Sequence, residues 1–139
     1  MRGRWTTWPT ESRSLFELAT LPDDPEREAF GQYHAFASPT GGFMLRKGRY
    51  KYHYYVGYPP ELFDLAEDPA ELHDLAADQA HRETLDKMEA LLRARINPEE
   101  VDRQAKEAQA ALIERHGGRE KARNAGAPGT TPVPGYAQE

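Results

Sequence analysis

The residues whose side chains suit acid–base catalysis or metal binding are scattered along this 139-residue chain. It has five histidines, at His34, His53, His73, His81 and His116. No two of them stand at the two- or four-residue spacing that brings two imidazoles to one metal ion. There is no cysteine, which excludes disulfides, thiolate metal sites and cysteine nucleophiles. We therefore expect no metal site and no catalytic residue in this chain.

A basic and aromatic run is the most distinctive feature of the sequence. Its cations alternate with tyrosines: Arg46, Lys47, Arg49 and Lys51 with Tyr50, Tyr52, Tyr54, Tyr55 and Tyr58. One interpretation is a surface that stacks on single-stranded nucleic acid. The other is a half-buried strand whose tyrosines pack on helices while the cations stay in water. The strict alternation and the net charge of −5, from 18 basic and 23 acidic residues, favour the strand.

Alternation of apolar and polar residues predicts the sheet that must position these side chains. Four strands are expected between about residues 29 and 65, at 29–36, 43–47, 49–56 and 61–65. Short connections between successive strands favour an antiparallel meander. In this register Tyr52 and Leu65 face the core, and Lys51 faces solvent.

The pattern becomes helical in the second half of the chain. Apolar residues at helical spacing, including Leu85, Met88 and Leu92, predict a helix over about 79–95. Asn97-Pro98 is a typical helix start, so a second helix should run to about residue 116. The fold class is therefore α+β: a four-stranded antiparallel sheet packed by helices, with two carboxy-terminal helices and an extended tail. We expect one small domain over 1–125, followed by a tail rich in Gly and Pro over 126–139.

Composition limits the class of protein further. A length of 139 residues suits one domain, and its acidic balance is opposite to that of a general nucleic-acid binder. No apolar run approaches the roughly 20 residues that span a bilayer, and no apolar segment follows the basic residues at the amino terminus. We expect a cytoplasmic protein that binds neither nucleic acid nor membrane.

Three segments carry a resemblance to a known family. Residues 43–52 read FMLRKGRYKY, residues 61–65 read ELFDL, and residues 67–76 read EDPAELHDLA. Together they resemble the carboxy-terminal part of sulfatases of the choline-sulfatase-like and arylsulfatase group, in the alkaline phosphatase superfamily. The resemblance extends over about residues 14–116 and implies that this chain corresponds to the small carboxy-terminal domain of such an enzyme.

The last of these motifs also has a structural interpretation. Asp64 and Asp68-Pro69 are expected to form a turn that ends the last strand and starts the next helix. Four leucines are expected to hold this turn against the sheet: Leu62, Leu65, Leu72 and Leu75.

The resemblance also implies where the chemistry lies. In sulfatases the reaction takes place in a large amino-terminal domain, where a formylglycine forms from Cys or Ser and acidic and amide side chains hold Ca or Mg. This chain has no Cys and no Ser-x-Pro-x-Arg motif, so we expect no cofactor in it and no sulfatase activity from it alone. The implied function is a subdomain that completes the substrate cleft and supports oligomerisation. The alternative is a stand-alone binding or assembly module derived from such a domain.

The resemblance places one stretch, Gln32-Tyr33-His34, near the substrate pocket. Members of the family commonly have Glu where this chain has Gln32, and a neutral amide interacts less with a cationic substrate group. We expect His34 to contact substrate, with Tyr33 and Gln32 beside it; otherwise His34 is an ordinary histidine of the sheet.

Exposed apolar side chains are expected to be covered by a partner, which is either a second copy of the chain or a sulfatase catalytic domain. Self-association would use the final helix, with Val101 and Leu112, and the tail. Further candidates for this apolar surface are Phe30, Phe36, Phe43 and Tyr55.

Overall fold

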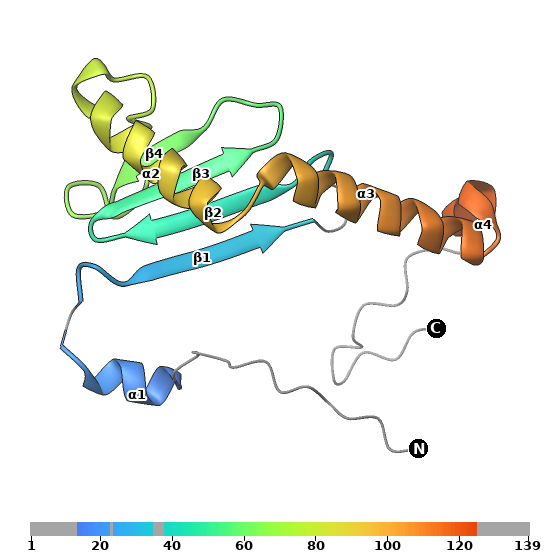
Figure 1. Cartoon of the computed structure of the whole chain (residues 1–139), viewed down its shortest axis with the longest axis horizontal. Helices are drawn as coiled ribbons and strands as arrows, with labels where there is room; N and C mark the ends of the chain where they lie inside the picture. The colour runs from blue at the N-terminus through green and yellow to red at the C-terminus, as the bar shows by residue number, and fades with distance from the viewer. Residues whose placement is uncertain (1–13, 23, 35–37, 125–139) are drawn as a thin grey trace, which may run out of the picture.

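Each strand of the sheet pairs with the next strand of the chain, so the strand order is β1-β2-β3-β4 and every pairing is antiparallel. The computed structural model describes residues 14–22, 24–34 and 38–124 (Figure 1). Its strands are β1 (Glu28–Tyr33), β2 (Gly42–Lys47), β3 (Tyr50–Tyr55) and β4 (Glu61–Asp64). Its helices are α1 (Leu15–Thr20), the 3-10 turn η1 (Gln79–His81), α2 (Arg82–Arg95), α3 (Pro98–Arg115) and α4 (Gly118–Asn124). The predicted α+β meander is confirmed.

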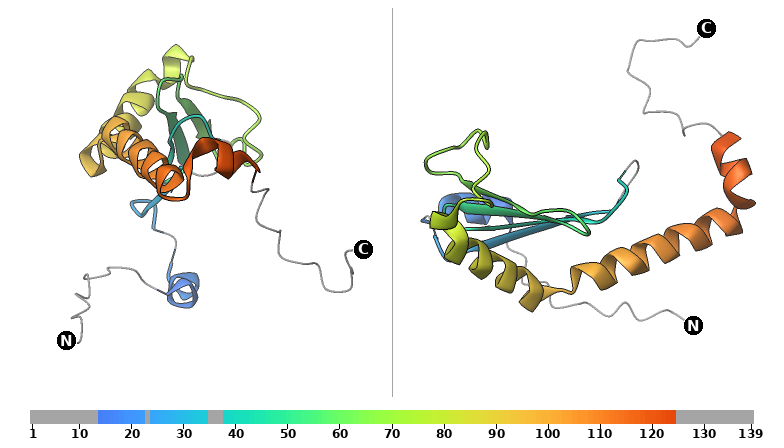
Figure 2. Two further views of the ribbon diagram at one scale, coloured as in Figure 1. Left: turned by 90° about the vertical axis from the view of Figure 1, so that its right-hand side faces the viewer. Right: turned by 90° about the horizontal axis from the view of Figure 1, so that it is seen from above.

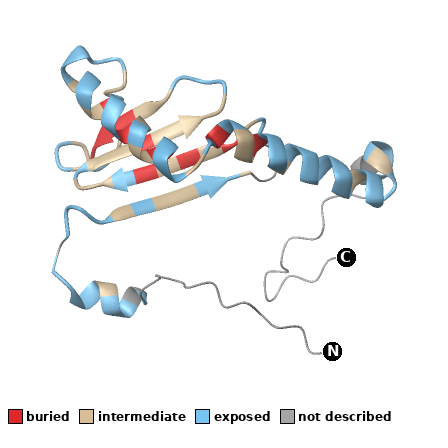
Figure 3. Cartoon of the chain, viewed as in Figure 1, coloured by how far each residue is buried: buried red, intermediate tan, exposed pale blue. Residues whose placement is uncertain are grey.

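One face of the sheet forms the core together with α2. Phe43 and Leu45 of β2, Tyr52 of β3 and Leu62 of β4 lie on this face and are buried. The buried side of α2 supplies Leu85, Met88 and Leu92. In Figure 3 the buried residues form a band along the central strands, under α2. The alternation of the tyrosine strand is therefore a packing pattern, as the sequence suggested, although Phe43 belongs to the core and not to an exposed surface.

The opposite face of the sheet carries no helix among the described residues. The views in Figure 2 place α2 and the start of α3 on one side of the sheet, and α1 lies apart from the body (Figures 1 and 2). We call this opposite side the bare face. It presents Tyr33, Met44 and Tyr55 toward one end and Arg46 toward the other.

The acidic motif after β4 folds into turns that are tied down by its own carboxylates. Asp64 accepts hydrogen bonds from the N–H of Ala66 at its side chain and from the N–H of Asp68 at its carbonyl. Asp68 in turn accepts from the N–H of His73 at 2.8 Å. Asp74 accepts from the N–H of Leu62 at 3.0 Å, which fastens the loop to β4. The predicted turn is confirmed, but the next helix starts only at residue 79.

The exposure of three side chains in this region differs from what the sequence predicted. Leu72 is 76% exposed, because it follows the turn at Glu71, whose backbone is left-handed with φ at 56°, and does not reach the sheet. Lys51 is not free in solvent: its ammonium lies 2.8 Å from the carboxylate of Glu71, and 23% of its side chain is exposed. Leu65 is half-buried rather than fully buried.

The second long helix begins as predicted and then leaves the sheet. Asn97 caps α3 by accepting from the N–H of Glu100 at 3.1 Å, and Pro98 occupies the first turn. Val101 packs against the core, whereas Leu112 further along is 51% exposed. The expected tail at 126–139 and the residues before 14 lie outside the described residues, as does Phe36.

Candidate functional site

His34 follows β1 directly and turns its imidazole back toward the core side of the sheet. Its ring meets the edge of the Phe43 ring, with the centroids 5.3 Å apart and the planes at 74°. Both ring nitrogens are buried, and neither has a hydrogen-bond partner among the described residues. Since buried polar atoms are rarely left unpaired, this imidazole has the capacity for one donor and one acceptor contact that the described residues do not supply.

Helix α3 holds the segment that carries His34. The Asp102 carboxylate accepts a hydrogen bond from the N–H of Gly41 at 2.7 Å, and the Gln109 amide donates to the carbonyl of His34 at 2.6 Å. Gly41 lies directly against the imidazole, since a Cβ there would come within 2.7 Å of His34 Cε1. The absence of a side chain at Gly41 therefore creates the place that the ring occupies.

The charges around this corner are balanced within α3. Burial acts to raise the pKa of Asp102, but hydrogen bonds from the Lys106 ammonium and from the N–H of Gly41 outweigh burial and lower it. The Lys106 ammonium lies 2.7 Å from Asp102 Oδ2. Asp102 therefore stays ionised near neutral pH, and it places a negative charge beside the His34 pocket.

Of the other two predicted site residues, Gln32 lies on the same side of β1 as His34, and Tyr33 lies on the opposite side. Tyr33 pairs with Gly42 and points to the bare face, where it is 54% exposed. Gln32 pairs with Phe43, shares the face of His34 and is exposed. The structure thus brings Gln32 and His34 to one side of the strand end and Tyr33 to the other.

The sequence did not single out Asp102 or Gly41 as parts of this corner. Asp102 stands four residues after Pro98, and both are buried, so they share the inward side of α3. In the sequence, the signal that could have placed Asp102 on this side of the helix was its spacing of four residues from Pro98. The cavity beside His34, Gly41 and Asp102 measures about 20 Å³, room for about one water.

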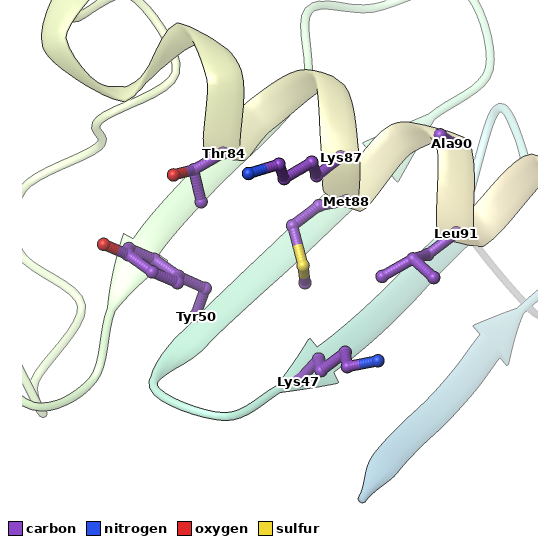
Figure 4. A pocket seen from close by; sticks show the side chains of 7 residues that line it. All are labelled: Lys47, Tyr50, Thr84, Lys87, Met88, Ala90 and Leu91. Carbon is purple, nitrogen blue, oxygen red and sulfur yellow. The ribbon is translucent and has the colours of Figure 1, made fainter. Parts of the chain in front are cut away.

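A larger recess lies between α2 and the turn that joins β2 to β3. It has a volume of about 590 Å³, and Figure 4 shows Met88 and Leu91 reaching down from α2 beside Tyr50 of β3. Its two cations, Lys47 and Lys87, are already paired with acids. No cluster of His, Asp or Glu able to hold a metal ion was found among the described residues. None of the helices in this described part is long and apolar enough to cross a membrane.

Comparison with solved structures gives matches to sulfatases. A crystal structure from Bacteroides thetaiotaomicron, of a protein assigned as a sulfatase, is 33% identical over 52% of this chain and 16% of its own, with a TM-score of 0.46. A 2-O GAG sulfatase, BT1596, is 32% identical over 53% of this chain and 16% of its own, with a TM-score of 0.47. The chain resembles the carboxy-terminal region of sulfatases.

The sulfatase-like match is confined to a small part of the larger proteins. A third structure, BT4656 in complex with its substrate D-glucosamine-2-N,6-O-disulfate, is 19% identical over 62% of this chain and 17% of its own, with a TM-score of 0.44. The matched regions thus span 16–17% of the length of these proteins. No family model matches the chain, and no curated protein matches it.

Proposed function

We propose that this chain acts as the small carboxy-terminal subdomain of a sulfatase, a sulfuric ester hydrolase, and completes the substrate cleft beside a catalytic domain. The observation that carries the proposal is the bare face of the sheet. Both long helices lie on the other side, so Met44 and Tyr55 on the bare face are covered by no helix of the described part of the chain and stay partly exposed. The loop after β4 covers part of this face, where Glu71 pairs with Lys51, and the rest of it carries no second layer among the described residues. A sheet with a partly open face is typical of an element that packs against a second layer.

The motif that carries the family resemblance supports a structural role for this chain. Three of its carboxylates, those of Asp64, Asp68 and Asp74, each accept a backbone N–H group of these turns, and Asp74 also accepts one from β4. Carboxylates engaged in this way hold a loop in place. In the proposed enzyme the formylglycine and the Ca or Mg belong to the catalytic domain, and this chain supplies binding surface.

The corner at His34 is the proposed contribution to the cleft. Its imidazole nitrogens have no partner among the described residues, and they are buried beside a cavity of about 20 Å³, so in this proposal His34 reaches the substrate through one bound water. Exposed Gln32 on the same side of the strand end adds a second polar group. His34 in this proposal is a binding residue.

A chimera tests this proposal. The carboxy-terminal region of the 2-O GAG sulfatase would be deleted or replaced by residues 14–124 of this chain. We expect the deletion to abolish sulfate ester hydrolysis and the replacement to restore a measurable part of it. His34→Ala in the chimera should then lower the activity again.

Two control variants distinguish a lost contact between the two domains from a general loss of stability of the chimera. Met44→Asp places a charge on the bare face and should prevent recovery, whereas Ala110→Asp on the exposed surface of α3 should not. A chimera that melts cooperatively at the temperature of the parent enzyme and hydrolyses no more than the deletion would contradict the proposal.

A second candidate function is an assembly module, and the exposed end of α3 favours it. Leu112 is half exposed on a helix that extends beyond the sheet. Self-association through this helix would bury Leu112. Light scattering tests it: Leu112→Asp should reduce the mass from a multiple of 15.7 kDa to the single-chain value. If the unsubstituted protein already has the mass of a single chain, the assembly function is excluded.

A further inference from the structure

A second recess surrounds the turn between β2 and β3, at the opposite end of β1 from His34. Its volume is about 830 Å³. Arg27 and Arg46 line it, together with the acids Asp24 and Glu26 and with small residues that include Ala29 and Gly48. Six residues of extended chain lie between Arg27 and His34, so this recess and the corner at His34 are about 20 Å apart.

Arg27 and Arg46 differ from the other cations of the described sheet and helix region. Within residues 24–34 and 38–106, the remaining lysines and arginines each form an ion pair with an acid: Lys47, Arg49, Lys51, Arg82, Lys87, Arg93, Arg95, Arg103 and Lys106. Arg27 and Arg46 have no such pair there, although the chain carries an excess of acids. Both unpaired guanidinium groups line the same recess.

The acids near these arginines are already engaged. Glu26 pairs with Lys47 at 3.3 Å, and Asp24 accepts a hydrogen bond from the N–H of Glu26 at 3.0 Å. Arg49, at the far wall, is held by Asp64 and Glu67. What distinguishes the recess is therefore two guanidinium groups without an ion pair among the described residues, and not a net positive charge.

Small residues stand beside the two arginines. Ala29 and Arg46 are direct partners across β1 and β2, so the methyl group of Ala29 lies beside the Arg46 stem. Arg27 stands two residues before Ala29, in the segment that leads into β1, and lines the same recess. Gly48 forms the tight turn with φ at 57°, and a Cβ there would approach the carbonyl of Pro25 to 3.3 Å.

We propose that this recess binds a tetrahedral dianion, a sulfate or phosphate group, between Arg27 and Arg46. A guanidinium group offers paired N–H donors that match the oxygens of such a group, and two of them neutralise its two charges. The group arrives either as the free ion or as an ester on a small molecule. This site is separate from the corner at His34, so it is independent of the proposed function.

An NMR titration of the full chain tests the site. Sodium sulfate, sodium phosphate, glucose 6-sulfate and glucose 6-phosphate would be added at constant ionic strength, with sodium acetate as the monovalent comparison. We expect saturating shifts of the Gly48 and Ala66 amides with a dissociation constant at or below about 1 mM for the dianions. Tighter binding of the esters would identify an esterified ligand, and equal or weaker binding would identify the free ion.

Charge-matched variants decide whether the two arginines form the site. Arg27→Gln and Arg46→Gln should each weaken binding about tenfold or more, while Arg115→Gln and Arg119→Gln remove one charge elsewhere and should leave it unchanged. The melting temperature of each variant checks that it folds. Shifts that fail to saturate, or that weaken equally in all four variants, would overturn the proposal.

Discussion

The Asp102 carboxylate accepts a hydrogen bond from the N–H of Gly41 at 2.7 Å, across 61 residues of sequence. This contact ties α3 to the segment between β1 and β2, and so it fixes the His34 ring that lies against Gly41. A single helix side chain therefore controls the position of the residue that we assign to the substrate side.

Removing this carboxylate should destabilise the chain. Asp102→Ala leaves a buried N–H at Gly41 without a partner, and we expect a loss of about 1–3 kcal/mol in the free energy of unfolding. Asp86→Ala is the matched control, because Asp86 forms an exposed pair with Arg82 whose loss should cost about 0.5 kcal/mol or less. Urea denaturation of both variants measures the difference, and equal midpoints would contradict this role for Asp102.

Gly41→Ala should displace the His34 ring. The added Cβ would lie 2.7 Å from Cε1 and 2.9 Å from Nδ1 of the imidazole, too close to be tolerated without movement. We expect shifted imidazole NMR signals for His34 and altered ring signals for Phe43. Gly31→Ala is the control, since its Cβ would meet only the end of Met44 at 3.6 Å, and unchanged His34 signals in both variants would refute the contact.

Tyr52→Phe should leave stability unchanged or increase it. The ring is fully buried, and its hydroxyl has no hydrogen-bond partner among the described residues. Burial raises the pKa of this phenol, so it stays neutral while the protein is folded. Removing an unpaired buried hydroxyl costs little, whereas Tyr52→Ala should cost about 3–5 kcal/mol through the cavity it leaves. A large loss for Tyr52→Phe in thermal unfolding would indicate a partner for the hydroxyl.

His53 should make stability depend on pH. Burial lowers its pKa below the ordinary 6.5, the charge of Lys51 acts in the same direction, and Glu61 and Glu71 oppose it. As the pH falls, the unfolded chain binds the proton first, so this contribution is full above pH 6.5 and is lost as the pH falls through the folded pKa. Urea midpoints between about pH 7.5 and pH 5 should fall less for His53→Gln than for the wild type. Parallel pH profiles would show that His53 is not the cause.

The regular elements were predictable because their signals are local. The alternation around Tyr52 and the cap at Asn97-Pro98 each depend on a few neighbouring residues, and both predictions are confirmed. The prediction that Leu72 packs on the sheet was wrong, because the direction of this side chain follows from the left-handed turn at Glu71. A non-glycine residue rarely adopts that conformation. The prediction that Lys51 is exposed to solvent was wrong, because its partner Glu71 lies 20 residues away in that same loop.

The corner at His34 was only partly predictable for the same reason. The position of His34 at a strand end follows from the strand pattern, but its neighbours Gly41 and Asp102 come from a loop and a helix that the sequence does not place in contact. The role of the His34 stretch in binding remains a prediction. Contacts over long sequence distances carry little signal in one sequence, because each partner also suits an ordinary surface or cap.

The order of the strands has a consequence for how this chain reaches its native state. Every strand pairs with its immediate neighbour, and the buried core residues lie between Phe43 and Leu92. Few contacts therefore require distant parts of the chain to meet, and proteins of this kind fold quickly for their size. The sheet and α2 can assemble as one unit, whereas the hydrogen bond from Gly41 to Asp102 joins residues 61 apart in sequence and needs α3 in place. Slow exchange of the amides in β2 and β3, with faster exchange at the far end of α3, is the pattern that such a folding order leaves in the native protein.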